Sequence, residues 1–398
     1  MAQLVQAQRD YFLSGKTRSL ESRLAALRAL SEGLKECETE ILEALQADLH
    51  KPKEEAFLAE VGFLIEEIRF ALKHLPKWVK PQKQRGSFLT PFGRSEIYPE
   101  PLGVVLVIGP WNYPCQLVLS PLIGAIAAGN CGVLKPSELA PQTSKVIARL
   151  VASVFPPAFV TVVEGGLETS QALLLEKWDH IFFTGGTAIG KHVMAAAAHH
   201  LTPVTLELGG KSPCLVDENT DLEVTARRIT WGKFMNAGQT CVAPDYLLVP
   251  TSLVTPLARK IAESVHRFFG EDPKTSPDYG RIIHQRHFER LLGLINPRKV
   301  FFGGQSDSSS CYLAPTLMTE VTAEDKVMGE EIFGPILPIV EYTKWEEALA
   351  WVKARPKPLA LYYFGKNRER EAQVIEQLSF GGGCVTVSYT HLTLPTKA

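Results

Sequence analysis

The sequence has little that would direct it to a membrane, a nucleic acid or an oxidising compartment. Its 398 residues carry a formal net charge of -1, so no excess of charge favours nucleic acid or an anionic membrane surface as a partner. No stretch approaches the roughly 18 apolar residues of a transmembrane helix. The N-terminus also lacks the basic-then-apolar order of a signal peptide. We therefore expect a cytoplasmic protein without a membrane anchor.

Cysteine and histidine patterns for disulfides or metals are absent as well. The seven cysteines are scattered, odd in number and never spaced as C-x-x-C. This argues against a disulfide framework and favours a reducing compartment. The ten histidines show no pairing at ligand spacing beside cysteines or carboxylates, so we expect no metal site.

Short apolar runs that alternate with helical patterns are what the sequence does have. After two helical stretches at 3–50 and 54–78, runs typical of buried parallel strands occur at 103–109, 131–135, 159–164 and 180–184. A second series of such runs lies at 213–216, 245–250, 312–318, 336–342 and 359–364. The alternation predicts an α/β fold, with a doubly wound Rossmann-like domain followed by a second α/β domain. The proline- and glycine-rich segment 80–101 is predicted to be an arm or hairpin.

One cysteine and one glutamate have the types expected of a nucleophile and its base. Cys241 ends the small, polar, turn-prone stretch 234–241, and Glu207 lies in the stretch 205–211. The thiolate is the attacking form of cysteine and needs assistance to form at neutral pH. A lone cysteine is more often a small core residue, so this interpretation depends on the surrounding motifs.

A glycine-rich turn follows the predicted strand 180–184. Gly185, Gly186 and Gly190 lead into a helical run, which is the context of a dinucleotide phosphate site at a helix N-terminus. The spacing is G-G-x-x-x-G rather than G-x-G-x-x-G, so the segment is either a cofactor loop or an ordinary tight turn.

Four further polar residues follow or precede predicted strands. Lys135 and Glu138 either hold ribose hydroxyls or lie in solvent. Asn112, between two prolines, either donates a hydrogen bond to an oxyanion or caps a turn. Glu331 contacts a cofactor, activates water or ends a surface helix.

Six motifs in this order resemble the aldehyde dehydrogenase superfamily. They are Pro-Trp-Asn-Tyr-Pro at 110–114, Lys-Pro-Ser-Glu at 135–138, Phe-Thr-Gly-Gly-Thr at 183–187, Glu-Leu-Gly-Gly-Lys at 207–211, Gly-Gln-Thr-Cys at 238–241 and Glu-Glu-Ile-Phe-Gly-Pro at 330–335. The resemblance covers residues 5 to 385 and is greatest to the class 3, fatty-aldehyde-type branch.

The resemblance implies NAD- or NADP-dependent oxidation of medium- or long-chain, or aromatic, aldehydes to carboxylic acids. Cys241 would form a thiohemiacetal and then a thioester, Asn112 and the backbone N–H of Cys241 would hold the oxyanion, and Glu207 would activate water. Glu331 is a rival base. The implied cofactor contacts are Lys135 and Glu138 at the adenosine ribose, Gly185, Gly186 and Gly190 along the dinucleotide, and Glu331 and Phe333 at the nicotinamide ribose and ring.

The resemblance also implies a domain plan and a homodimer. Residues 1–82 and 102–208 would form the NAD(P)-binding domain, 83–101 an oligomerisation arm and 209–385 the catalytic domain. Class 3 relatives continue for some tens of residues, and after a segment like 381–385 they usually read Asn-Asp, where this chain has Thr386-Val387. We therefore expect a truncated reading frame with an atypical tail at 386–398, and a homodimer if the missing segment is not essential.

Two other functions stay open at this point. One is a reductive member of the superfamily that acts on acyl phosphates or thioesters, which need no water-activating base and so fit Glu207 poorly. The other is a truncated, catalytically weak or inactive protein that retains cofactor or subunit binding.

Overall fold

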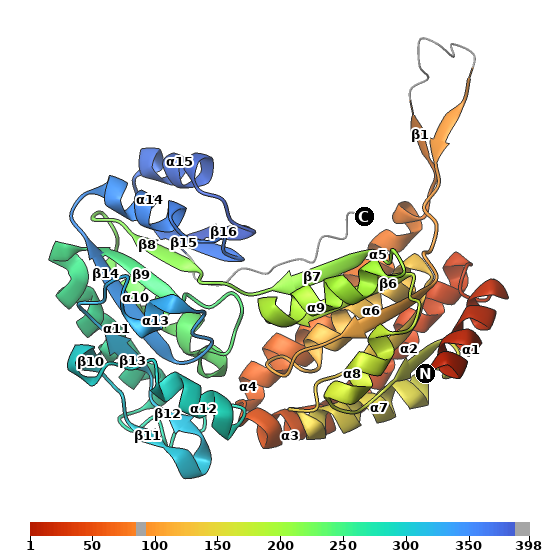
Figure 1. The fold of residues 1–398 in the computed structure, drawn as a ribbon, viewed down its shortest axis with the longest axis horizontal. Helices are drawn as coiled ribbons and strands as arrows, with labels where there is room; N and C mark the ends of the chain where they lie inside the picture. The colour runs from red at the N-terminus through yellow and green to blue at the C-terminus, as the bar shows by residue number, and fades with distance from the viewer. Residues whose placement is uncertain (85–92, 387–398) are drawn as a thin grey trace. The chain divides into compact units, whose positions relative to one another are not determined.

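The computed structural model describes residues 1–84 and 93–386, which divide into two compact units (Figure 1). Unit 1 comprises Met1–Asp48 and Ala56–Glu207, and unit 2 comprises Leu49–Glu55 and the chain from Leu208 onward. The segment 49–55 groups with unit 2, where the Leu49 carbonyl accepts a hydrogen bond of 2.9 Å from the Arg281 N–H. The predicted NAD(P)-binding range included this segment; the roles of the two domains stay predictions.

Unit 1 contains a five-stranded sheet within the described residues, in the order β5-β4-β3-β6-β7. The strands are β3 (Val104–Ile108), β4 (Cys131–Lys135), β5 (Val160–Val162), β6 (His180–Gly185) and β7 (Val204–Leu208). The pairs β3–β4, β3–β6 and β4–β5 are parallel. The chain moves outward from β3 to β5 and then returns to β6, so the strand order reverses between β3 and β6. The predicted doubly wound Rossmann-like arrangement is confirmed, and ligands bind such sheets at the carboxyl ends beside the reversal.

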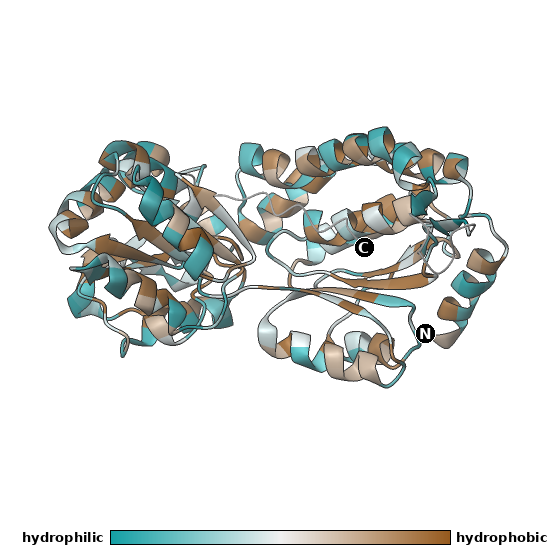
Figure 2. Cartoon of the chain, turned by 90° about the horizontal axis from the view of Figure 1, so that it is seen from above, coloured by the Kyte–Doolittle hydropathy of each residue, from teal (hydrophilic) through white to brown (hydrophobic). Residues whose placement is uncertain are grey.

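Helices connect these strands and cover the sheet. They are α6 (Gln116–Ala128), α7 (Pro141–Val154), α8 (Leu167–Leu174) and α9 (Thr187–Ala198). In Figure 2 the strands of unit 1 are largely apolar and lie between layers of helix. The strand β3 is buried at every position because both of its faces are covered.

The N-terminal helices complete the core of unit 1. They are α1 (Ala2–Leu13), α2 (Leu20–Glu36), α3 (Glu38–Leu49), α4 (Lys53–Ala56) and α5 (Gly62–Trp78), with a π-helical turn, η1 (Phe57–Val61), between the last two. Leu27, Leu30 and Leu34 of α2 are fully buried in this core. Each contributes about 1.5–3 kcal/mol to stability by leaving water. The π-helical turn has no signature in the sequence pattern.

The predicted arm is a hairpin where the structure describes it. β1 (Gln82–Gln84) pairs antiparallel with β2 (Ser95–Ile97), and residues 85–92 between them lie outside the described residues. The oligomerisation role of 83–101 stays a prediction. Of the predicted tail at 386–398, only Thr386 is among the described residues.

Unit 2 is built on a second sheet, seven-stranded in the described residues, with the order β10-β13-β14-β9-β8-β15-β16. These strands are β8 (Pro213–Val216), β9 (Tyr246–Pro250), β10 (Val300–Phe302), β13 (Thr316–Met318), β14 (Ile336–Tyr342), β15 (Ala360–Phe364) and β16 (Gly382–Val385). In the part of this sheet that the structure describes, β10 is antiparallel to its neighbour β13, and the other pairs are parallel. The second α/β domain is therefore confirmed as a fold.

Helices separate the strands of unit 2, and one of the predicted strands needs a correction. They are α10 (Leu222–Phe234), α11 (Val254–Phe269), α12 (Gln285–Leu292), α13 (Lys326–Gly329), α14 (Trp345–Lys353) and α15 (Arg368–Gln377). The run 312–318 was expected to be one strand but is two, β12 (Tyr312–Leu313), which pairs with β11 (Ser306–Asp307), and β13. Pro315 lies at the break, where its missing N–H cannot continue a ladder.

Candidate active site

The predicted residues of unit 1 follow three neighbouring strands at one edge of the sheet. Asn112 follows β3, Lys135 ends β4, and Gly185 ends β6. The carboxyl ends of parallel strands lie at the same edge, beside the reversal in strand order. The fold thus brings to one edge of the sheet residues that span more than 70 positions in the sequence, from Asn112 to Gly185.

Lys135 and Glu138 form an ion pair. The Lys135 side chain is 2% exposed, and its Nζ donates to the Pro136 carbonyl oxygen at 2.8 Å and to Glu138 Oε2 at 3.2 Å. The Glu138 side chain is about half exposed. A buried ammonium beside an exposed carboxylate can donate to one ribose hydroxyl while the carboxylate accepts from another, so the pair fits the predicted role.

Gly185, Gly186 and Gly190 open helix α9. Gly186 is the residue before its first turn, with an extended backbone, and a Cβ built there would meet no atom within 4 Å. A ligand can therefore approach the N–H groups at the start of this helix, where a phosphate is favoured. The fit to a dinucleotide rests on this open space and on the nearby Lys135–Glu138 pair.

Asn112 lies in the loop between β3 and α6 and is 2% exposed. The N–H of Gly109 donates to the Lys135 carbonyl oxygen at 3.0 Å, which fixes the start of the loop to the next strand. At its end, the N–H groups of Cys115 and Gln116 donate to the carboxylate of Glu60. The sequence alone did not single out Glu60.

Glu207 lies on β7, the edge strand of this sheet. Burial raises the pKa of its carboxyl above the usual range. A raised pKa favours a carboxylate that accepts a proton near neutral pH, as a general base does.

In unit 2, Cys241 follows a strained turn. Asn236, Ala237 and Gly238 all have positive φ angles, of 52°, 49° and 74°. A left-handed conformation costs a non-glycine residue about 1 kcal/mol or more. The fully buried Gln239 holds the turn, because its Nε2 donates to the Asn236 and Arg281 carbonyl oxygens at 3.0 and 2.9 Å.

The turn before Cys241 packs on the loop that carries Glu331 and Phe333. A Cβ built on Gly238 would collide with the carbonyl oxygen of Gly334, so only glycine permits this approach. Phe333 itself has a φ of 52°. Strained backbone on both sides of one contact is typical of functional sites. Within unit 2, the structure therefore brings Cys241, Glu331 and Phe333 into one region.

Glu331 packs directly on the glycine pair of the 207–211 motif. A Cβ on Gly209 would collide with both carboxylate oxygens of Glu331, and the N–H of Gly210 donates to this carboxylate. Burial is the main reason that the pKa of Glu331 is raised to about 7, although Lys211 and Lys233 act in the opposite direction. The ammonium of Lys233 is fully buried, and burial lowers its pKa to about 8.

Known proteins match this chain over nearly its whole length, in agreement with the order of the six motifs. The family model described as "Aldehyde dehydrogenase family" matches residues 1–392. The chain belongs to the aldehyde dehydrogenase family. It is thus an NAD(P)-dependent oxidoreductase of this family.

Relatives agree with the predicted class 3 branch. "Aldehyde dehydrogenase family 3 member A2" of Macaca fascicularis is 49% identical over 394 residues, which are 99% of this chain and 81% of the relative. "Aldehyde dehydrogenase, dimeric NADP-preferring" of Canis lupus familiaris is 45% identical over 394 residues, covering 99% of this chain and 87% of the relative. Among solved structures, "Substrate bound state of Staphylococcus Aureus AldH" matches with a TM-score of 0.96 and 44% identity over 98% of this chain and 86% of that one.

Positively charged side chains hold the loop of this aldehyde dehydrogenase that carries Glu331. Lys211 forms an ion pair with Asp245 and donates to the Val327 and Glu330 carbonyl oxygens at 2.9 and 2.8 Å. Arg290 donates to the Glu331 carbonyl oxygen at 3.2 Å and to that of Ile332.

Two further contacts hold the same loop. The Ile332 N–H donates to Asp245 Oδ1 at 2.9 Å. Burial, with a contribution from the nearby Arg290, lowers the pKa of His287 to about 4, so its ring is uncharged at neutral pH. Its Nε2 lies 2.8 Å from the Phe333 carbonyl oxygen and donates to it in the tautomer that this contact requires. The side chains that hold the loop belong to Lys211, Asp245, His287 and Arg290, which lie far apart in the sequence, and of these four only Lys211 stands in a motif.

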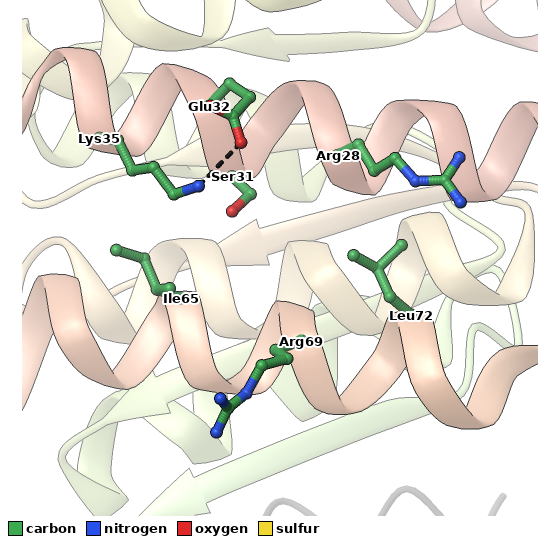
Figure 3. A pocket seen from close by; sticks show the side chains of 7 residues that line it. All are labelled: Arg28, Ser31, Glu32, Lys35, Ile65, Arg69 and Leu72. Carbon is green, nitrogen blue, oxygen red and sulfur yellow. Dashed lines mark hydrogen bonds and ion pairs between the residues drawn. The ribbon is translucent and has the colours of Figure 1, made fainter.

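A groove elsewhere in the aldehyde dehydrogenase contains none of the predicted residues. It lies between α2 and α5, with a volume of about 230 Å³ (Figure 3). Its lining consists of Arg28, Ser31, Glu32, Lys35, Ile65, Arg69 and Leu72. Two of its cations are paired with neighbouring glutamates, Lys35 with Glu32 and Arg69 with Glu66. We assign this groove no part in the reaction.

The described residues include no cluster of three or more histidine, cysteine or acidic side chains that could hold a metal ion. Likewise, over 1–84 and 93–386, no helix has the length and apolar character needed to cross a membrane.

Proposed function

We propose that this aldehyde dehydrogenase oxidises medium- or long-chain, or aromatic, aldehydes through a covalent intermediate on Cys241. The observation that carries the proposal is the strained turn before Cys241, packed through Gly238 on the loop of Glu331 and Phe333. Strain of this kind persists only where the surrounding structure imposes it. It gives the half-buried thiol of Cys241 a fixed place beside two residues proposed to contact the cofactor.

The proposed reaction begins with attack of the Cys241 sulfur on the aldehyde carbon. The tetrahedral thiohemiacetal carries an oxyanion, to which the side-chain amide of Asn112 and the backbone N–H of Cys241 donate. NAD or NADP, when bound, supplies the acceptor for the hydride that leaves this carbon. Glu207 takes a proton from water, which attacks the resulting thioester and releases the carboxylic acid and the thiol.

We propose that Lys135 and Glu138 hold the adenosine ribose, and that Gly185, Gly186 and Gly190 form the surface on which the phosphates lie. Glu331 and Phe333 would contact the nicotinamide ribose and ring.

The two glutamates, Glu207 and Glu331, are rivals for the role of base, and the structure gives both raised pKa values. We propose Glu207, because Glu331 is already packed on Gly209 and accepts a hydrogen bond from Gly210. The variant Glu207→Gln should then form the thioester at a normal rate and hydrolyse it slowly. Accumulation of thioester in Glu331→Gln instead would transfer the role to Glu331.

The test of the whole proposal is to trap the acylated enzyme. The purified chain is mixed with a long-chain or an aromatic aldehyde and either cofactor, formation of NAD(P)H is followed by absorbance, and the quenched protein is digested and mass-mapped. An acyl group on the peptide containing Cys241 is expected. Turnover with no label on that peptide would show that another residue is the nucleophile.

We further propose a cytoplasmic homodimer. The cysteines are scattered along the sequence and never spaced as C-x-x-C, which supports a reducing compartment. One relative is named as dimeric, and the β1–β2 hairpin offers an exposed strand pair for subunit contact. Light scattering of the purified chain and fractionation of expressing cells test the two statements.

A further inference from the structure

A buried glutamate occupies the π-helical turn η1. Glu60 is 0% exposed and lies between α4 and α5. A π-helical turn inserts extra backbone and so redirects side chains, and such turns are frequent at functional sites. Here the turn directs a carboxylate toward the start of α6.

The carboxylate of Glu60 binds the first N–H groups at the start of α6. Its Oε2 accepts from the N–H of Cys115 at 2.9 Å and from that of Gln116 at 3.0 Å. The N–H groups in the first turn of a helix have no partner inside the helix, and a negative charge there is favourable. Bonds from N–H groups to a buried carboxylate are also stronger than bonds between neutral groups.

The Asn112 loop is therefore fixed at both ends. Its start is held by the hydrogen bond from the Gly109 N–H to the Lys135 carbonyl oxygen. Its end is held at Cys115, three residues beyond Asn112, where the N–H donates to the carboxylate of Glu60. Between these points two prolines restrict the backbone.

We propose that Glu60 is a positioning residue that places the Asn112 amide for the oxyanion. This inference rests on the proposed role of Asn112. An error of about 1 Å in the place of a group that contacts the transition state can lower the rate by about 100-fold, so losing the fixed end of the loop should be visible in kcat.

Asp48 provides a matched control in the same unit. Its carboxylate accepts from the N–H groups of Gln142 and Thr143 at 3.2 and 2.8 Å, at the start of α7. It holds a helix start in the same way as Glu60, but α7 follows the loop of Lys135 and Glu138 rather than that of Asn112.

The experiment is a double-mutant cycle on kcat with a long-chain aldehyde. Glu60→Ala is expected to lower kcat about 100-fold, and Glu60→Gln, whose amide oxygen can still accept, by less than about 10-fold. In the background of Asn112→Ala, either Glu60 variant should change kcat by less than about twofold, because residues that act through one another do not add. Asp48→Asn should have the same effect on kcat in both backgrounds.

Cofactor titration and thermal unfolding accompany each variant, and binding of NAD(P)H is expected to be unchanged in Glu60→Gln. If Glu60→Ala does not fold, the cycle is read with Glu60→Gln. A kcat loss that is equal with and without Asn112, or no loss at all, would overturn the positioning role while leaving the proposed function intact. An unaltered kcat in Asn112→Ala alone would instead overturn the role of Asn112 in the proposed function, and the positioning role with it.

Discussion

The two units hold their proposed functional loops with side chains of opposite charge. In unit 1, the carboxylates of Glu60 and Asp48 accept hydrogen bonds from backbone N–H groups. In unit 2, the cations Lys211 and Arg290 donate to backbone carbonyl oxygens around Glu331. The loops of unit 1 open long helices whose first N–H groups have no partner inside the helix, whereas the loop of unit 2 follows the short helix α13, whose last carbonyl oxygens need partners outside it.

This difference gives each region a different electrostatic character. Near Asn112 the fixed charge is the carboxylate of Glu60, which accepts hydrogen bonds from the backbone N–H groups of Cys115 and Gln116. Around Glu331 the fixed charges are the cations Lys211, Lys233 and Arg290 together with the carboxylate of Asp245. Nevertheless burial outweighs these cations and raises the pKa of Glu331 to about 7. Substitutions in the two regions should therefore change different quantities. We expect a loss of kcat at Asn112, and changes in the KM for the cofactor and in the pH dependence of stability around Glu331.

The largest effect is expected from unit 2, at the nucleophile. Cys241→Ala should lower turnover by more than about 10⁴-fold, because removing a covalent nucleophile leaves only binding and electrostatic stabilisation. Binding of NAD(P)H, measured by fluorescence titration, should be retained, because the proposed cofactor contacts do not include the thiol. A variant that keeps its activity would remove Cys241 from the mechanism.

The next effect is expected from unit 1, at the oxyanion donor. Asn112→Ala should lower kcat by about 10²–10³-fold, which is typical for the loss of one such donor, with little change in the KM for the cofactor. Steady-state kinetics with varied aldehyde and varied cofactor separate the two constants. An increase in cofactor KM with kcat unchanged would place Asn112 at the cofactor instead.

Asn112 and Cys241 could be proposed from the sequence, but the carboxylates that hold the helix starts of unit 1 could not. Asn112 and Cys241 stand in compact motifs, and the strands before or after them follow the apolar periodicity. Glu60 lies 55 positions from Cys115, and Asp48 lies 94 from Gln142. A hydrogen bond between a distant carboxylate and a backbone N–H leaves no local pattern, because the N–H is common to all residues except proline.

The same limit explains which elements of the fold were missed. The buried strands β3 and β4 have continuous apolar runs and were predicted within one or two residues. β7 has a half-buried pattern with Glu207 in the middle, and β16 consists of two glycines, a cysteine and a valine. Edge strands such as these are stabilised by their neighbours rather than by their own composition.

A smaller effect is expected from Arg290, one of the two cations that hold the Glu331 loop of unit 2. Arg290→Lys should raise the KM for the cofactor by about tenfold with a smaller change in kcat, because the single nitrogen of a lysine head cannot replace the planar fork of Arg290. One terminal nitrogen of that fork donates to Glu330 and the Glu331 carbonyl oxygen, and the other donates to the Ile332 carbonyl oxygen. The control is Arg368→Lys, which alters a pair with Glu371 on an exposed helix and should leave both constants unchanged. If both substitutions changed the KM for the cofactor equally, Arg290 would have no specific effect on the proposed cofactor site.

The smallest effect concerns stability and its dependence on pH. The pKa of Glu331 rises from 4.5 to about 7 on folding, mainly through burial, so the folded state binds this proton more tightly than the unfolded state. The contribution of Glu331 to stability is therefore greatest below about pH 4.5 and is lost as the pH rises through about 7. Glu331→Gln removes this loss, and its Tm should exceed that of the wild type by about 2–4 °C at pH 8, with the difference shrinking toward pH 5. Glu341→Gln, at an exposed position of β14, controls for the replacement of a surface carboxylate. A Glu331→Gln variant that is less stable than the wild type at pH 8 would mean that Lys211, Lys233 and Arg290 stabilise the carboxylate more than burial disfavours it, and the contrast between the two units would then lie in charge pairing alone.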